Sequence, residues 1–194
     1  LRRADQIVTT APANSKVEVL APYAEKCKVI PLAADLNDED FSSENYAQIK
    51  RKIGCDGEKV ILYVGRLVYY KGLGYLLEAL KNVDAKLVLV GKGDERSRLK
   101  RKAAEMGLES RVYFAGYVSD ERLPLYYSVA DLFVLPSISP AEAFGIVQIE
   151  AMSYGLPVVN TNLPTGVPFV SQHERTGLTV PPQDVQALVT AINR

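Results

Sequence analysis

The chain has 194 residues, 47% of them hydrophobic and 24% charged, and its formal net charge at pH 7 is zero. This length suffices for one domain with a sizeable core, or for one domain and a fragment of another. The balanced charge gives no electrostatic case for nucleic acid, and no apolar run approaches the roughly 18 residues that a membrane-spanning helix requires. The two cysteines, Cys27 and Cys55, have no metal-ligand spacing, so the sequence predicts a reducing, cytoplasmic environment.

The first 59 residues have a weaker pattern than the rest of the chain. The elements expected there are strands at 5–10 and 27–31, helices at 13–21 and 46–53, and an acidic loop at 35–40. Because the chain begins with Leu1 in the middle of a pattern, we expect it to be a piece of a longer protein.

From residue 60 onward, apolar strand-like runs alternate with helical patterns. We expect strands at 60–64, 86–90, 112–115, 132–135, 157–161 and 178–180, and helices at 75–80, 94–106, 120–129, 144–154 and 184–192. Such alternation predicts a parallel sheet with helices on both faces, whose ligands bind beyond the carboxyl ends of the strands. The candidate residues that follow strands in this position are Arg66, Gly91, Val118, Ser137 and Glu142.

The most informative stretch is 137–157, which carries Glu142 and Glu150 with seven residues between them. Gly145, in the first turn of the expected helix, lets a ligand approach the backbone, and a helix start favours anions. On that helix Glu150 falls on the apolar stripe that faces the core. A carboxylate there costs free energy unless it is paired, so either a ligand hydroxyl or the protein backbone must satisfy it.

A second candidate region joins the strand at 60–64 to the next helix. Gly65-Arg66 and Lys71-Gly72 place two cations on one short loop. Two such cations can bracket a nucleotide diphosphate and stabilise the charge that it gains as a leaving group. The alternative is a solvated loop with ordinary basic residues.

The stretch 137–157 resembles the donor-site signature of glycosyltransferase family 4, in which two glutamates are separated by seven residues and Phe-Gly-Ile follows the first. Further segments resemble that family in the same order: Val64-Gly65-Arg66-Leu67 with Lys71-Gly72, the runs at 87–93 and 112–118, and Thr176-Gly177-Leu178 with Pro181-Pro182. The resemblance implies a GT-B fold and a retaining enzyme. Such an enzyme transfers a sugar from a nucleotide-diphosphate sugar to a hydroxyl of a glycan or lipid-linked acceptor.

The resemblance also implies a division of the chain. Residues 42–194 would form the Rossmann-like, sugar-nucleotide-binding C-terminal domain of the GT-B fold, without its terminal helix. Residues 1–41 would be a remnant of the N-terminal domain and the interdomain linker. Because most of the acceptor-binding domain would be missing, we expect this piece alone to be inactive.

Individual roles follow from the same resemblance. Glu142 would contact the donor sugar near the reacting carbon and is the catalytic candidate, Glu150 would hold the ribose, and Val118 would lie near the nucleobase. The residues expected to meet the diphosphate are Gly65, Arg66, Lys71, Phe144, Gly145, Ile146 and Val147, the last four through backbone N–H groups.

Neither a metal nor a cofactor is expected. Asp38-Glu39-Asp40 has the spacing of a metal-binding DxD motif, but it lies in the linker, far in sequence from the signature, and fits a helix cap better. The resemblance to family 4 likewise implies no metal.

Basic residues gather on and just before the expected helix at 94–106: Lys92, Arg96, Arg98, Lys100, Arg101 and Lys102. A solvated face is the simpler interpretation. The other is peripheral contact with the inner face of an anionic membrane, where a lipid-linked acceptor would lie. Two other functions stay open, namely a GT-B relative such as a sugar-nucleotide epimerase, and a non-catalytic module that binds a partner.

Overall fold

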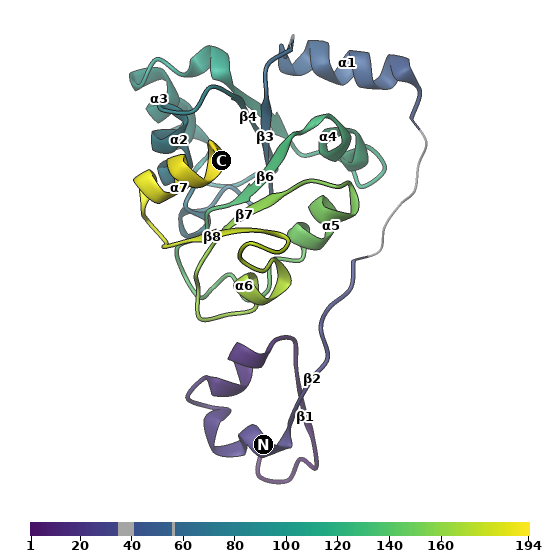
Figure 1. Ribbon diagram of the computed structural model, residues 1–194, viewed down its shortest axis with the longest axis vertical. Helices are drawn as coiled ribbons and strands as arrows, with labels where there is room; N and C mark the ends of the chain where they lie inside the picture. Colours follow the sequence, from purple (N-terminus) through teal and green to yellow (C-terminus); the bar gives the residue numbers. More distant parts are fainter. Residues whose placement is uncertain (35–40, 56) are drawn as a thin grey trace.

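The computed structural model describes residues 1–34, 41–55 and 57–194 (Figure 1). The acidic loop expected at 35–40, with its DxD motif, lies outside these residues. Within the described ranges, no helix is long and apolar enough to cross a membrane.

A small N-terminal unit contains two short parallel strands, β1 (Ile7–Thr9) and β2 (Cys27–Val29), and two 3-10 helices, η1 (Pro12–Lys16) and η2 (Ala21–Lys26). The α-helix expected at 13–21 is therefore wrong. Val17 is extended, and the Ser15 hydroxyl donates to the Pro12 carbonyl at 2.8 Å. Short polar side chains that bond to nearby backbone, together with β-branched valines, disfavour an α-helix.

The main sheet has six parallel strands in the order β5-β4-β3-β6-β7-β8. Their bounds are β3 (Val60–Val64), β4 (Lys86–Val90), β5 (Val112–Gly116), β6 (Leu132–Leu135), β7 (Val158–Thr161) and β8 (Gly177–Val180). Every residue of β3 and β4 is buried, as expected of strands covered on both faces. The expected parallel α/β sheet is confirmed.

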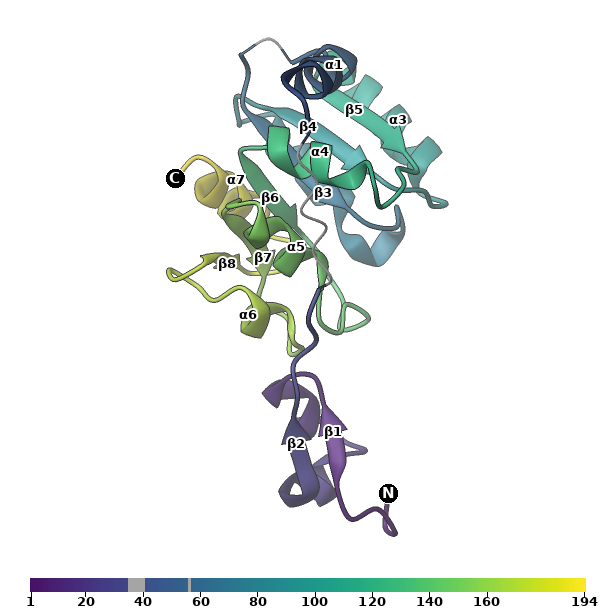
Figure 2. The ribbon, with the colours of Figure 1, turned by 90° about the vertical axis from the view of Figure 1, so that its right-hand side faces the viewer.

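Helices cover both faces of this sheet (Figure 1 and Figure 2). They are α1 (Ser43–Ile53), α2 (Leu73–Leu80), α3 (Arg96–Glu105), α4 (Leu123–Val129), α5 (Val147–Ser153), α6 (Val167–Val170) and α7 (Val185–Ile192). On one side α2 contacts both α3 and α7, and on the other α1 contacts α4. The small N-terminal unit lies beside α6, where Ala11 is buried close to Gly166.

The helix after β6 differs from its prediction in both start and orientation. It begins at Val147 rather than at 144, because Gly145 takes a left-handed conformation with φ of 72°. Its fully buried residues are Gln148 and Ala151, whereas Glu150 is only partly buried. The prediction that Glu150 lies on the side of the helix that faces the core is therefore wrong. Gln148 can be buried because its amide is hydrogen-bonded, which apolar periodicity cannot reveal.

The order of the strands creates a crevice between β3 and β6. The chain runs from β3 outward through β4 to β5, and then crosses to β6 on the other side of β3. At such a switch point the loops that follow the two central strands diverge, and ligands of open α/β sheets bind there. The loops are also held together, since the Ile138 N–H donates to the Tyr70 carbonyl at 2.8 Å.

Candidate functional site

A buried ion pair joins the two loops at the switch point. Lys71 ends the 3-10 helix η3 (Tyr69–Lys71) after β3, and its Nζ contacts Oε2 of Glu142 in the loop after β6. Lys71 is 9% exposed and Glu142 7%. The Ser137 hydroxyl donates to the same Oε2 at 2.9 Å. Two residues predicted from the sequence are thus brought into direct contact, and Ser137 supports them.

The two oxygens of the Glu142 carboxylate differ in their surroundings. Lys71 and Ser137 both bind Oε2, and no described residue is a partner of Oε1. Oε1 is not among the fully buried unsatisfied atoms of the described residues, so solvent reaches it. The carboxylate is therefore fixed through one oxygen and offers the other to a ligand.

Arg66 lies beside this pair on the loop after β3. Its side chain is exposed, and Nη2 is 3.3 Å from the Tyr70 hydroxyl. Below it, the buried Tyr63 hydroxyl donates to the Arg66 carbonyl at 2.8 Å. Burial and the nearby Glu142 carboxylate raise the pKa of the Tyr63 phenol well above its usual value. A protonated phenol therefore holds the loop that carries Arg66 and Lys71.

The loops after β3, β4 and β5 are joined by backbone hydrogen bonds. The Gly65 N–H donates to the Val90 carbonyl at 3.0 Å, and the Gly91 N–H donates to the Gly116 carbonyl at 2.7 Å. Val118 is partly buried against the core just beyond β5. These segments form one continuous edge, along which the loop after β4 lies between the loop of Gly65 and the loop of Val118.

Glu150 has a partner that the sequence did not indicate. The Tyr127 hydroxyl, from α4, donates to its Oε2 at 2.7 Å. Tyr127 in turn stacks on Tyr154, with ring centroids 5.3 Å apart and planes 5° apart. Burial, with Glu150 beside it, raises the pKa of the Tyr127 phenol far above its usual value. The expected need of Glu150 for a partner is met by a phenol, and not by the backbone.

The segment from Phe144 to Val147 precedes and opens α5. Phe144 and Gly145 are buried, while Ile146 and Val147 are partly exposed. A Cβ on Gly145 would lie 2.7 Å from Leu135 Cδ2, so only glycine fits this left-handed turn. With seven residues, α5 offers a short helix start rather than the long one expected.

Three other observations concern the described residues away from the Lys71–Glu142 pair. They contain no group of three or more His, Cys, Asp and Glu side chains that could hold a metal ion. The His173 Nδ1 accepts from the Thr179 N–H at 3.0 Å. A cavity of about 570 Å³ lies at the opposite edge of the sheet, near the strand starts at Val60, Val158 and Gly177. Its lining includes neither Lys71 nor Glu142.

The sheet and its switch-point site agree with comparisons to known proteins. Residues 45–194 match the family described as glycosyl transferases group 1, and the chain belongs to this family. It is 33% identical over 194 residues to O-antigen chain mannosyltransferase C of Escherichia coli, which covers 100% of this chain and 51% of that protein. It is 34% identical over 194 residues to D-rhamnosyltransferase WbpZ of Pseudomonas aeruginosa, which covers 99% and 50%. The chain spans about half the length of these relatives.

Solved structures show the same fold. HepE of Anabaena in complex with UDP superposes with a TM-score of 0.88 at 28% identity, covering 99% of this chain and 54% of that one. Sucrose-phosphate synthase of Thermosynechococcus elongatus gives a TM-score of 0.84 at 34% identity, covering 100% and 49%. The fold is therefore the Rossmann-like α/β fold found in GT-B glycosyltransferases.

Proposed function

We propose that this chain is the donor-binding half of a retaining family 4 glycosyltransferase. The whole enzyme transfers a sugar from a nucleotide-diphosphate sugar to a hydroxyl of a glycan or lipid-linked acceptor. The observation that carries the proposal is the buried Lys71–Glu142 pair at the switch point of the sheet. The structures of HepE with UDP and with UDP-glucose support a nucleotide sugar as the donor.

Two cations bind the diphosphate in this proposal. Arg66 is exposed at the mouth of the site, and Lys71 lies at its floor, next to Glu142. The leaving diphosphate gains negative charge as its bond to the sugar breaks, and fixed cations stabilise that charge. Gly65 permits close approach of the backbone, and the segment from Phe144 to Val147 adds N–H donors. These groups neutralise the diphosphate without a divalent metal or another cofactor.

The two glutamates bind hydroxyl groups at different parts of the donor. Glu142 accepts hydrogen bonds from the sugar through Oε1, because Lys71 and Ser137 occupy Oε2. It orients the sugar near the reacting carbon. Glu150 accepts from the ribose, and the Tyr127 hydroxyl fixes the rotamer in which it does so. Val118 lies beside the base.

The acceptor would be bound by a part of the enzyme that this chain does not include. The remaining half of the enzyme would bind the acceptor, so this chain alone would bind the donor without turnover.

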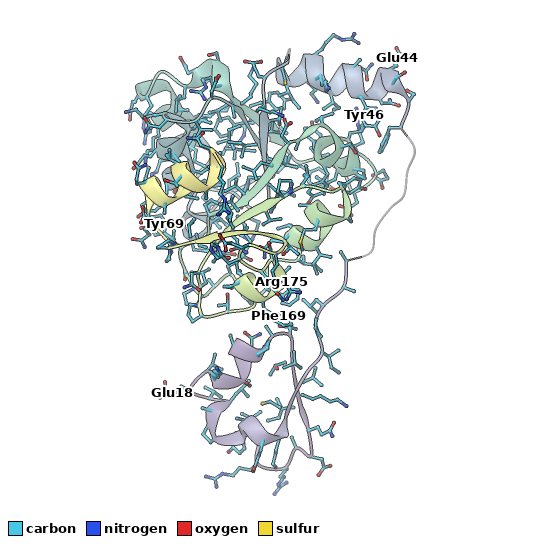
Figure 3. The ribbon with its side chains drawn as sticks, in the orientation of Figure 1. Glu18, Glu44, Tyr46, Tyr69, Phe169 and Arg175 are labelled. Atoms are coloured by element: carbon cyan, nitrogen blue, oxygen red, sulfur yellow. The ribbon has the colours of Figure 1, made fainter. Side chains whose placement is uncertain are left out.

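We place the protein in the cytoplasm, in peripheral contact with the inner face of the membrane. In residues 41–55 and 57–194, the large hydrophobic side chains that are exposed are Tyr69, which is labelled in Figure 3, and Tyr117. Each has a cation over its ring, Arg98 at 5.9 Å and Lys92 at 5.2 Å, a combination that favours an anionic interface.

Sedimentation with vesicles tests the membrane contact. The chain is expected to bind vesicles that contain phosphatidylserine, and the double substitution Tyr69→Ser with Tyr117→Ser should abolish that binding. Equal binding to vesicles of phosphatidylcholine alone, or no change in the double variant, would exclude this surface as the contact.

Calorimetric titration with UDP, GDP and ADP tests the donor site. One diphosphate should bind, and Arg66→Ala should weaken it by about tenfold because a charge-assisted contact is lost. Glu150→Ala should also weaken it through the ribose. Arg101→Ala is the matched control, since the one ion pair that Arg101 forms within the described part of the chain is with Glu105 on the exposed face of α3. If no diphosphate binds either this chain or the full-length protein, the non-catalytic module becomes the better interpretation.

A further inference from the structure

A pair of buried amides lies directly beneath the loop that opens α5. Gln148 on α5 and Asn160 on β7 are both 0% exposed, and Asn160 Nδ2 donates to Gln148 Oε1 at 2.8 Å. The Gln148 Nε2 group faces the carbonyls of Phe144, Gly145 and Val167 at 3.4, 3.3 and 3.4 Å. One amide pair thus ties α5 and β7 to the loop after β6 and to α6.

Packing alone does not explain this pair. Burying an amide costs free energy unless its polar atoms are satisfied, and Asn160 Oδ1 has no partner among the described residues. A methionine or a leucine would fill similar volumes without that cost. The amides do what an apolar side chain cannot, which is to hold backbone carbonyls in one direction.

The direction of those carbonyls determines where the loop presents its N–H groups. In a trans peptide the C=O and the N–H of the next residue point to opposite sides, and the chain has no cis peptide bond among its described residues. Since the Phe144 and Gly145 carbonyls face inward to Gln148, the N–H groups of Gly145 and Ile146 face the other way. Among the described residues, neither N–H group donates a backbone hydrogen bond beyond those within helices and strands.

The left-handed turn is built around the same amide. A Cβ on Gly145 would lie 2.8 Å from Gln148 Nε2, so the glycine backbone wraps closely over the amide. The neighbouring peptide is fixed from α6, because the Gly166 N–H donates to the Ala143 carbonyl at 2.8 Å. On the far side, Asn160 Nδ2 also donates to the Ser171 carbonyl at 3.1 Å.

We propose that Gln148 and Asn160 are positioning residues that aim the N–H groups of Gly145 and Ile146 at the donor diphosphate. This inference rests on the donor site of the proposed function. Gln148 and Asn160 do not touch the ligand themselves. Together with the backbone N–H of Gln148, which donates to the Gly145 carbonyl at 3.0 Å, they set the orientation of the two peptide planes whose N–H groups contact it.

The test uses Gln148→Met, which keeps the length of the side chain and removes the amide, and Asn160→Leu as an independent second variant. Thr179→Val is the matched control. Thr179 is the cross-strand partner of Asn160 on β8, and its buried hydroxyl has no partner among the described residues. For each variant, binding of UDP, GDP and ADP is measured by calorimetry, binding of the matching nucleoside by ligand-observed NMR, and folding by thermal unfolding.

Both amide variants are expected to bind the diphosphate about tenfold more weakly, as for loss of one hydrogen bond to a charged group. Nucleoside binding should be unchanged, and Thr179→Val should match the wild type. A merely structural role would weaken nucleoside and diphosphate in the same proportion, and this result would overturn the inference. Unchanged diphosphate binding in a folded Gln148→Met protein would also overturn it, while the donor site would stand. If the wild type binds no diphosphate, the donor site fails and this inference fails with it.

Discussion

Lys71 and Glu142 are separated by 71 positions in the sequence, yet they form one buried ion pair across the crevice between β3 and β6. The contact is possible because β3 and β6 are neighbours in the sheet, so that the loops at their carboxyl ends meet. Each charge is the counter-ion of the other in a region that solvent barely reaches. The pair is therefore both a structural link between the loops and the floor of the proposed donor site.

Removing one partner of this pair should destabilise the fold more than removing both. Glu142→Gln leaves Lys71 without a counter-ion, and we expect a loss of about 3 kcal/mol in the free energy of unfolding. Lys71→Met should cost a similar amount. The double variant should lose less than either single variant, and therefore clearly less than the sum, since neither charge is then left alone. Urea denaturation of the four proteins measures this coupling, and additive losses would show that the pair is not coupled.

Glu142→Gln should separate recognition of the sugar from recognition of the diphosphate. The free nucleoside diphosphate should bind this variant at least as tightly as the wild type, because Lys71 is released for the phosphate and a negative charge is gone. The corresponding sugar nucleotide should lose any additional affinity that it has for the wild type. Calorimetry with both ligands checks this. Equal weakening of both ligands would mean that Glu142 acts on the diphosphate side or only on the fold.

Gly72 should tolerate no side chain, because it is the point at which the two loops touch. Its φ is 69°, and a Cβ would lie 1.9 Å from the Pro136 carbonyl oxygen. Gly107 is a matched control, with φ of 68° and nothing within 4 Å of its Cβ position. Gly107→Ala should cost about 1 kcal/mol of backbone strain, and Gly72→Ala about 3 kcal/mol or more, since strain and a steric clash combine. Equal losses in thermal or urea unfolding would contradict this contact.

Stability should fall at high pH. Tyr63 and Tyr127 have pKa values raised by burial in the folded protein, whereas in the unfolded chain they ionise near pH 10. Above about pH 10 the unfolded state therefore loses protons that the folded state retains, and the free energy of unfolding decreases by about 1.4 kcal/mol per pH unit for each such tyrosine. Tyr127→Phe should remove one tyrosine's share of that slope. An identical slope in the variant, measured by urea unfolding from pH 9 to 11, would exclude Tyr127 as a source.

The sheet could be predicted from the sequence because its strands are continuous apolar runs. The expected bounds at 60–64, 86–90 and 132–135 are those observed. Such runs, buried on both faces, are recognisable without tertiary context. The prediction of an α-helix at 13–21 was wrong because local side-chain hydrogen bonds and valines compete with helix formation over a short stretch.

Candidate residues for the site could be named from the sequence, but the contacts between them could not. Lys71 and Glu142 stood out by type and position, yet their pairing depends on which strands are neighbours. Glu150 was recognised as needing a partner, but Tyr127 comes from a different helix. Gln148 was missed because the predicted apolar stripe directed Glu150, and not Gln148, toward the core. Its position three residues after Gly145, where it can reach back to the turn, was the one local signal.

The proposed donor site can be located by a map of backbone amide shifts in the ¹⁵N-labelled chain during titration with UDP, GDP and ADP. We predict that one diphosphate shifts the amides at the carboxyl ends of the strands, above all those of Gly65, Arg66, Gly145 and Ile146. Amides around the 570 Å³ cavity at the other edge, such as those of Val60, Gly177 and Ile192, should stay unchanged. Shifts concentrated at that cavity, or spread evenly over the surface, would contradict a donor site built on Lys71 and Glu142.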